Sequence, residues 1–188
     1  RIPSGCEMVR MTLSAPEEPP EHPVVLTFEG SAAIGGRNVT RRAQPAENLM
    51  QAFLWRHLMP WRECVVDVTG RRRRKVLPEL TGGSPVSIPL GGRVKVRMRA
   101  PGRLPADNIE IVLAQPPPGI AVEEAAVHVG GVDVILGADS PAESGLAGNL
   151  IAEAFTERTL RGREGKPDRT RRVSLGVLPA IPFEIVRE

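Results

Sequence analysis

Short runs of alternating apolar residues, separated by glycine and proline, limit this chain to a β-rich fold. Ile109, Ile111 and Leu113 alternate with other residues, and the same period of two recurs in residues 94–98 and 132–136. Alternation over roughly four to eight residues is typical of a strand with one buried face. Glycine and proline occur 19 times each, mostly between these runs, where they favour turns. The pattern predicts an all-β fold of antiparallel strands.

Paired glycines mark the turns between several of these runs. Gly130-Gly131 separates two alternating runs and predicts a hairpin, because glycine accepts the positive φ of a tight hairpin turn. Gly91-Gly92 lies in the same way between residues 86–90 and 94–98, and it predicts a second hairpin. In contrast, residues 160–172 are charged and have no apolar period, which predicts an exposed loop.

The first half of the chain gives fewer signals. Residues 8–13, 24–28 and 64–68 alternate and predict strands. Residues 46–59 are ambiguous, because their apolar side chains recur at helical spacing. They also contain one copy of a weak internal repeat, because residues 48–53 resemble residues 149–155. The later copy is predicted to be a strand. The repeat favours a strand here, and a helix remains the alternative.

A run of five basic residues, at positions 71–75, separates the two halves. It predicts a solvated linker and a boundary between residues 1–75 and 76–188, and it leaves open whether the first module is truncated at its start. Such a run could instead bind nucleic acid, with an affinity that falls steeply with salt. The net charge of +3 is small for a chain of 188 residues, so we expect no nucleic-acid partner.

Two cysteines, Cys6 and Cys64, lie near the first and last predicted strands of the first half. A disulfide between them would close this half on itself, and two buried free thiols are the equal alternative. Neither they nor His57 has the close-spaced partners of a zinc site. Carboxylates such as Asp133 could bind calcium, but solvated surface carboxylates are favoured. We therefore predict no metal and no cofactor.

Trp55 and Trp61 are the only tryptophans, and they flank His57. If exposed, the three residues could form a ligand-binding platform for a sugar or a peptide. Packing in a core or an interface is the favoured alternative. The sequence contains neither a G-x-S-x-G nucleophile motif nor a phosphate-binding GK[ST] loop, so we do not expect an enzyme. No run approaches the roughly 20 apolar residues of a membrane span, and none is expected.

A proline-proline-glycine turn opens the most distinctive stretch of the second half. The stretch comprises Pro117-Pro118-Gly119-Ile120-Ala121-Val122, an alternating strand ending at Leu136, then Ala138-Asp139, Gly145, Gly148 and Asn149-Leu150-Ile151. This order resembles the immunoglobulin-like sandwich modules of large secreted bacterial proteins, mainly over residues 85–155. The resemblance implies two antiparallel immunoglobulin-like β-sandwich modules in tandem and an extracellular or periplasmic location. It implies no particular functional residues.

We therefore predict a non-catalytic structural or interaction module of a larger secreted bacterial protein. Its expected partners are the remainder of that protein and, beyond it, a carbohydrate or another protein. The alternative is a carbohydrate-binding module that uses Trp55 and Trp61 as a stacking platform.

Overall fold

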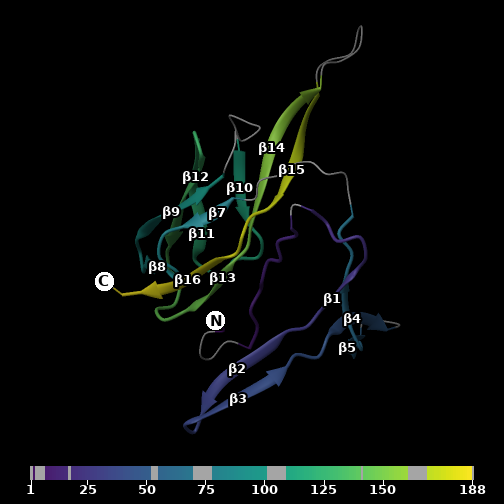
Figure 1. The fold of residues 1–188 in the computed structure, drawn as a ribbon. Helices are drawn as coiled ribbons and strands as arrows, with labels where there is room; N and C mark the ends of the chain where they lie inside the picture. The colour runs from purple at the N-terminus through teal and green to yellow at the C-terminus, as the bar shows by residue number, and fades with distance from the viewer. Residues whose placement is uncertain are drawn as a thin grey trace. The chain divides into compact units, whose positions relative to one another are not determined.

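A computed structural model describes residues 2, 7–16, 18–51, 55–69, 78–100, 109–140, 142–160 and 169–187. Every regular element in these ranges is a β-strand, so the predicted all-β class is confirmed (Figure 1). No stretch within them forms a helix with the length and hydropathy needed to cross a bilayer.

The chain forms two compact units. The large unit comprises Arg1–Ser14 and Lys75–Glu188, and the small unit comprises Ala15–Arg74. The predicted division at residues 75 and 76 assigned the first 14 residues to the first half. The structure places these residues with the second half instead, so the small unit is inserted into the sequence of the large one.

Hydrogen bonds explain why the N-terminal segment belongs to the large unit. Asn149 Nδ2 donates to the carbonyl of Arg10 at 2.7 Å, and the backbone N–H of Ala180 donates to Thr12 Oγ1 at 2.9 Å. The strand predicted for residues 8–13 is therefore wrong, since no strand is found there. Backbone and side-chain groups of this segment pair with individual groups of the large unit rather than with a strand ladder.

The described strands of the large unit form three sheets. Their orders are β11-β12-β9-β7, β10-β14-β15 and β13-β16-β8, and all pairs are antiparallel except β16 with β8. The strands are β7 (Glu79–Thr81), β8 (Val86–Pro89), β9 (Arg93–Arg99), β10 (Ile109–Leu113), β11 (Ile120–His128), β12 (Gly131–Ala138), β13 (Ala147–Leu150), β14 (Ala152–Leu160), β15 (Arg169–Val177) and β16 (Ile181–Val186).

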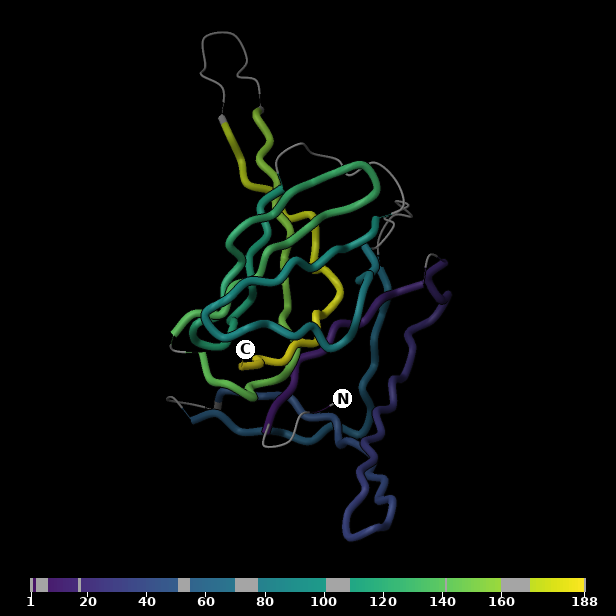
Figure 2. The backbone as a smooth tube through the Cα atoms, turned by 90° about the vertical axis from the view of Figure 1, so that its left-hand side faces the viewer, coloured from purple at the N-terminus to yellow at the C-terminus, as the bar shows by residue number. Residues whose placement is uncertain are grey.

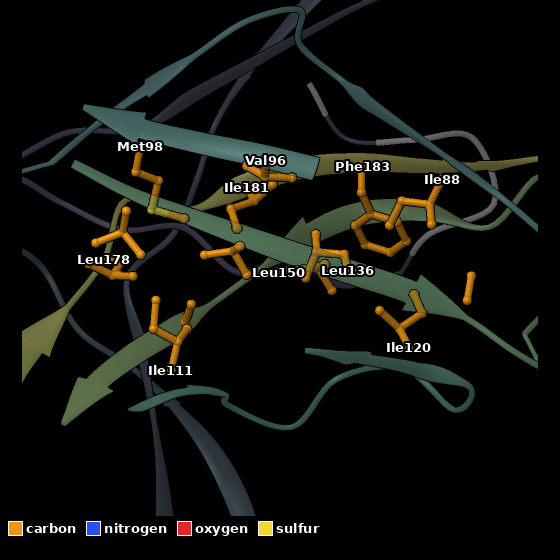
Figure 3. Close-up of a cluster of buried hydrophobic side chains, with 14 of the residues drawn as sticks. Ile88, Val96, Met98, Ile111, Ile120, Leu136, Leu150, Leu178, Ile181 and Phe183 are labelled. Atoms are coloured by element: carbon orange, nitrogen blue, oxygen red, sulfur yellow. The ribbon is translucent and has the colours of Figure 1, made fainter. Parts of the chain in front are cut away.

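One hydrophobic core joins these sheets, and Figure 3 shows its side chains meeting between them. Val134 and Leu136 of β12 are 0% exposed, and Phe183 of β16 is 2% exposed. Each buried side chain of this size contributes about 1.5–3 kcal/mol through the hydrophobic effect. At this level of detail the large unit fits a β-sandwich.

The two hairpins predicted from paired glycines have different outcomes. The hairpin of β11 and β12 is confirmed, although its turn residues are Val129 and Gly130, because His128 pairs with Gly131. Gly130 has a φ of +92°, which explains the glycine there.

The predicted hairpin of β8 and β9 is wrong, because the two strands belong to different sheets. The backbone N–H of Leu90 donates to Val186 at 2.9 Å, and that of Gly91 donates to Ala138 at 2.6 Å. Gly91 and Gly92 therefore carry the chain from one sheet to another. Sequence alternation predicted both strands but could not identify their partners.

The proline-proline-glycine turn is present before β11. Gly119 has a φ of +80°, and a Cβ at this position would lie 2.3 Å from the carbonyl oxygen of Asp139. Both the backbone conformation and the close approach of Asp139 therefore require glycine.

The small unit consists of three two-stranded pairs, as far as its residues are described (Figure 2). These are β1 (Val24–Leu26) with β6 (Cys64–Val66), β2 (Glu29–Ile34) with β3 (Arg37–Arg42), and β4 (Ala46–Gln51) with β5 (Trp55–Pro60). The strand interpretation of residues 46–59 is thus correct and the helix alternative wrong, with residues 52–54 outside the described ranges. No described residue of this unit is buried.

Core packing of the large unit predicts a large effect of truncating Phe183. We expect Phe183→Ala to lower the free energy of unfolding by about 3–5 kcal/mol, because it leaves a cavity between the sheets. Urea unfolding followed by far-ultraviolet circular dichroism measures the change. Val129→Ala is the control, since Val129 is fully exposed in the β11–β12 turn. Equal losses in the two variants would contradict the core described above.

Candidate functional site

The β4–β5 hairpin brings the predicted platform residues onto one face. Trp55, His57 and Met59 alternate along β5, so they point to the same side of the hairpin. The backbone N–H of Trp61 donates to the carbonyl of Pro45 at 2.8 Å, which extends the ladder past Pro60 and places Trp61 on that side. We call Trp55, His57, Met59 and Trp61 the tryptophan face.

Solvent covers this face in the structure. Trp55 is 73% exposed and Trp61 is 52% exposed, and His57 between them is exposed as well. The two tryptophans are six residues apart, which corresponds to about 20 Å along a strand. The two tryptophans therefore do not pack in a core of this chain, because no described position of the small unit is buried. Packing in an interface, the other part of the favoured expectation, stays a prediction.

The opposite face of the same hairpin is also apolar. Met50 is 64% exposed and Leu58 is 74% exposed, and both alternate with the tryptophan face. The sequence analysis missed these two residues. The signal was present as adjacent apolar pairs, Leu49-Met50 and Leu58-Met59, because neighbouring apolar residues in a strand occupy both faces.

A cavity of about 180 Å³ lies within the small unit. It is smaller than the roughly 300–1,000 Å³ of most small-molecule sites. The β4–β5 hairpin is therefore the better candidate binding site. Its lining residues are Leu26, Thr27, Phe28, Arg42, Ala43, Gln44, Pro45, Ala46, Arg62, Glu63 and Cys64. Cys64 is a half-buried free thiol. Cys6 lies outside the described residues, so the disulfide and the pair of buried thiols both stay predictions. Residues 71–75 also lie outside them, so nucleic-acid binding by this run is untested.

A charged cluster surrounds Asp133 on the β9, β11 and β12 strands of the large unit. Asp133 Oδ1 accepts hydrogen bonds from Arg97 Nε at 2.8 Å and from His128 Nε2 at 3.1 Å. Asp133 Oδ2 lies 3.4 Å from Lys95 Nζ and accepts a second bond from Arg97 at 3.1 Å. The favoured interpretation of Asp133 as a solvated surface carboxylate is therefore wrong, because the carboxylate is 9% exposed and paired with side chains of the protein.

The environment of Asp133 stabilises its ionised form. Hydrogen bonds from Arg97 are the largest cause that lowers the pKa of Asp133 well below its ordinary value, and those from His128 and Lys95 act in the same direction. Burial of the carboxyl group opposes them but does not prevail. Asp133 lies within the apolar run of β12, and basic residues alternate along residues 93–99. These two patterns together could have predicted the cluster.

Asp133 and its neighbours form an electrostatic contact that joins three strands. Glu123 and Arg93 form another ion pair on the same sheet. Among the described residues, no three histidine, cysteine or carboxylate side chains come together as a metal site. The charged side chains around Asp133 and Glu123 are thus paired with one another. The β4–β5 hairpin is therefore the stronger candidate site.

Comparisons with known proteins gave no match. No family model matches the sequence, no curated protein matches it, and no solved structure matches the fold. The resemblance to immunoglobulin-like modules therefore stays a prediction.

The low pKa of Asp133 predicts how stability depends on pH. We expect Asp133→Asn to destabilise the large unit at pH 7, where the wild-type carboxylate is ionised and bound by Arg97. Unfolded aspartate takes up a proton near its ordinary pKa of about 3.9, whereas the folded one stays ionised to lower pH. The wild-type advantage should therefore shrink as the pH falls below about 4. Urea unfolding of both proteins between neutral and acidic pH tests this, and equal stability at pH 7 would refute it.

The exposure of the tryptophans predicts their fluorescence. In Trp55→Phe and Trp61→Phe variants, the remaining indole should emit at long wavelength and be quenched readily by acrylamide, because water reaches both rings. Trp55 should be quenched more than Trp61, following their exposures of 73% and 52%. Blue-shifted, protected emission from either residue would show that the isolated chain already covers this face.

Proposed function

We propose that this chain is a non-catalytic interaction module of a larger secreted bacterial protein. In this proposal the large unit is an immunoglobulin-like sandwich that acts as a rigid support. The β4–β5 hairpin of the small unit is the surface that a protein partner covers. The compartment and the parent protein follow from the resemblance of residues 85–155, and the surface follows from the hairpin.

One observation carries the proposal: both faces of a two-stranded hairpin expose large apolar side chains. Trp55 and Trp61 lie on one face, and Met50 and Leu58 lie on the other. Exposed apolar clusters of this kind mark interaction sites, because burial removes their surface from water. A partner that covers both faces accounts for all four residues.

The hairpin also offers its backbone. In the described part of the chain, β4 and β5 pair only with each other, so each has one edge without a strand neighbour. Such an edge can accept a strand from another polypeptide through main-chain hydrogen bonds. A protein can satisfy the edges and cover the apolar faces together, which favours a protein over a small polar ligand.

Site-specific photo-crosslinking tests the proposal in the cells that produce the protein. A photo-reactive amino acid at position 55 reports on the tryptophan face, and one at position 58 reports on the opposite face. We expect both positions to form an adduct with the same polypeptide. Position 129 is the control, because Val129 is as exposed but lies on the large unit. Adducts at neither hairpin position would contradict the proposed role.

A carbohydrate-binding module is the second candidate, because both tryptophans and His57 share one exposed face. A sugar stacks on aromatic rings and needs polar side chains nearby, so only this face would take part. It leaves the exposure of Met50 and Leu58 unexplained, which is why we rank it second.

Paired variants separate the two candidates. The double variant Trp55→Ala with Trp61→Ala should abolish binding under either candidate, because both use the tryptophan face. The double variant Met50→Ser with Leu58→Ser should weaken binding of a protein partner but not of a glycan. Glycan-array binding and recovery of the crosslinked partner provide the two measurements. Glycan binding that survives the Met50 and Leu58 changes but not the tryptophan changes would favour the carbohydrate module.

A further inference from the structure

The β14–β15 hairpin of the large unit extends beyond its sheet. Among the described residues, β10 pairs with β14 as far as Ile109 opposite Thr156, whereas β14 and β15 continue to pair until Leu160 opposite Arg169. Figures 1 and 2 show the ends of β14 and β15 projecting beyond the other strands of this unit. Residues 157–160 and 169–172 thus form a two-stranded arm, where the sequence had predicted a loop from residue 160 onward.

Like charges face each other across this arm. Arg158 lies directly opposite Arg171, and both are exposed. Like charges at directly opposed positions destabilise a strand pair. Neither arginine has an acidic partner among the described residues. The arm therefore presents two adjacent guanidinium groups whose charge is not compensated by described neighbours.

The adjacent arginine shows the contrast. Arg172 Nε donates to Glu110 Oε2 at 2.7 Å, and its guanidinium group lies 3.6 Å from the centre of the Phe155 ring. Arg172 is on the other face from Arg171, because successive residues of a strand alternate. The protein thus compensates one arginine of β15 internally and leaves its neighbour available on the opposite face.

The outer end of β15 also has an open edge. Within the described ranges, residues 170–172 pair with β14 on one side only. A peptide that adds to this edge would lie about 4.8 Å from β15, with alternate side chains on the face of Arg158 and Arg171. Acidic residues at those positions would lie beside Arg171 and on the same face as Arg158, one strand further away. Guanidinium groups bind carboxylates through paired hydrogen bonds.

We infer that the outer end of β15 is a docking edge for an extended, acidic segment of a partner protein. The segment adds to β15 as a strand, and its carboxylates offset the opposed charges of Arg158 and Arg171. An acidic peptide fits better than a nucleic acid, because only a polypeptide uses both the guanidinium groups and the main-chain edge. This site lies on a different unit from the β4–β5 hairpin, so it stands or falls independently of the proposed function.

A binding assay with the full chain tests the inference. The probe is a short fluorescein-labelled peptide in which glutamate alternates with threonine, and fluorescence anisotropy reports its binding. Arg158→Gln with Arg171→Gln should weaken binding roughly tenfold, the scale expected for the loss of two exposed ion pairs. Arg37→Gln with Arg41→Gln is the matched control, because it removes the same charge from the exposed strand β3. The control should bind as the wild type does.

A second probe tests the edge separately from the charge. Methylation of alternate backbone nitrogens in the same peptide keeps its carboxylates but blocks a strand ladder, so binding to the wild-type chain should be lost. Equal binding of the methylated peptide would overturn strand addition. Absence of peptide binding, or binding unaffected by the Arg158 and Arg171 changes, would also overturn the inference. Tighter binding of single-stranded DNA than of the peptide would do so as well and would identify a nucleic-acid site.

Discussion

Burial of β12 on both of its faces is the constraint on which the large unit depends. Val134 and Leu136 point into the core and are 0% exposed, while Asp133 on the other face is 9% exposed. β9 and β11 pair with the two edges of β12, so both edges of this strand are hydrogen-bonded as well. The core side of β12 also meets residues of the other two sheets, such as Phe183 and Ile111. Loss of this strand would divide the β11-β12-β9-β7 sheet and remove its central part of the core.

The outer face of β12 explains why the large unit shows no obvious ligand site on this sheet. A carboxylate at a position as enclosed as that of Asp133 is costly unless cations compensate it. Arg97 and Lys95 of β9 provide this compensation, and His128 of β11 adds a hydrogen bond. The strands that bury Asp133 thus also carry its partners. Its carboxylate oxygens are already engaged by these side chains rather than left for a ligand.

Sequence periodicity predicted the elements whose burial is one-sided and local. The strands at Ile109–Leu113 and Arg93–Arg99 follow the predicted alternation, since one face of each meets the core. It failed where tertiary contacts decide. β8 pairs with the distant β16 rather than with its neighbour β9, and no local signal specifies that choice.

The candidate site was predictable only in part. The sequence identified Trp55, His57 and Trp61 as a possible platform, and strand alternation places them on one face. Their exposure could not be predicted, because tryptophan is usually well covered in a folded chain. The second apolar face became visible only once residues 46–51 and 55–60 formed a hairpin rather than a helix.

Each unit has one exposed two-stranded ribbon, and the two ribbons lack different stabilising elements. This difference distinguishes the partners that we propose for them. A two-stranded ribbon is marginally stable in water, because it has neither a third strand nor an apolar cover. On β4–β5 the missing element is an apolar cover, so the partner gains mainly by burying surface from water. The outer arm of β14–β15 extends beyond the residues that form the apolar core, and its missing elements are a strand and negative charge. A partner suited to one ribbon therefore lacks the chemistry required by the other, which is why we propose a different polypeptide for each.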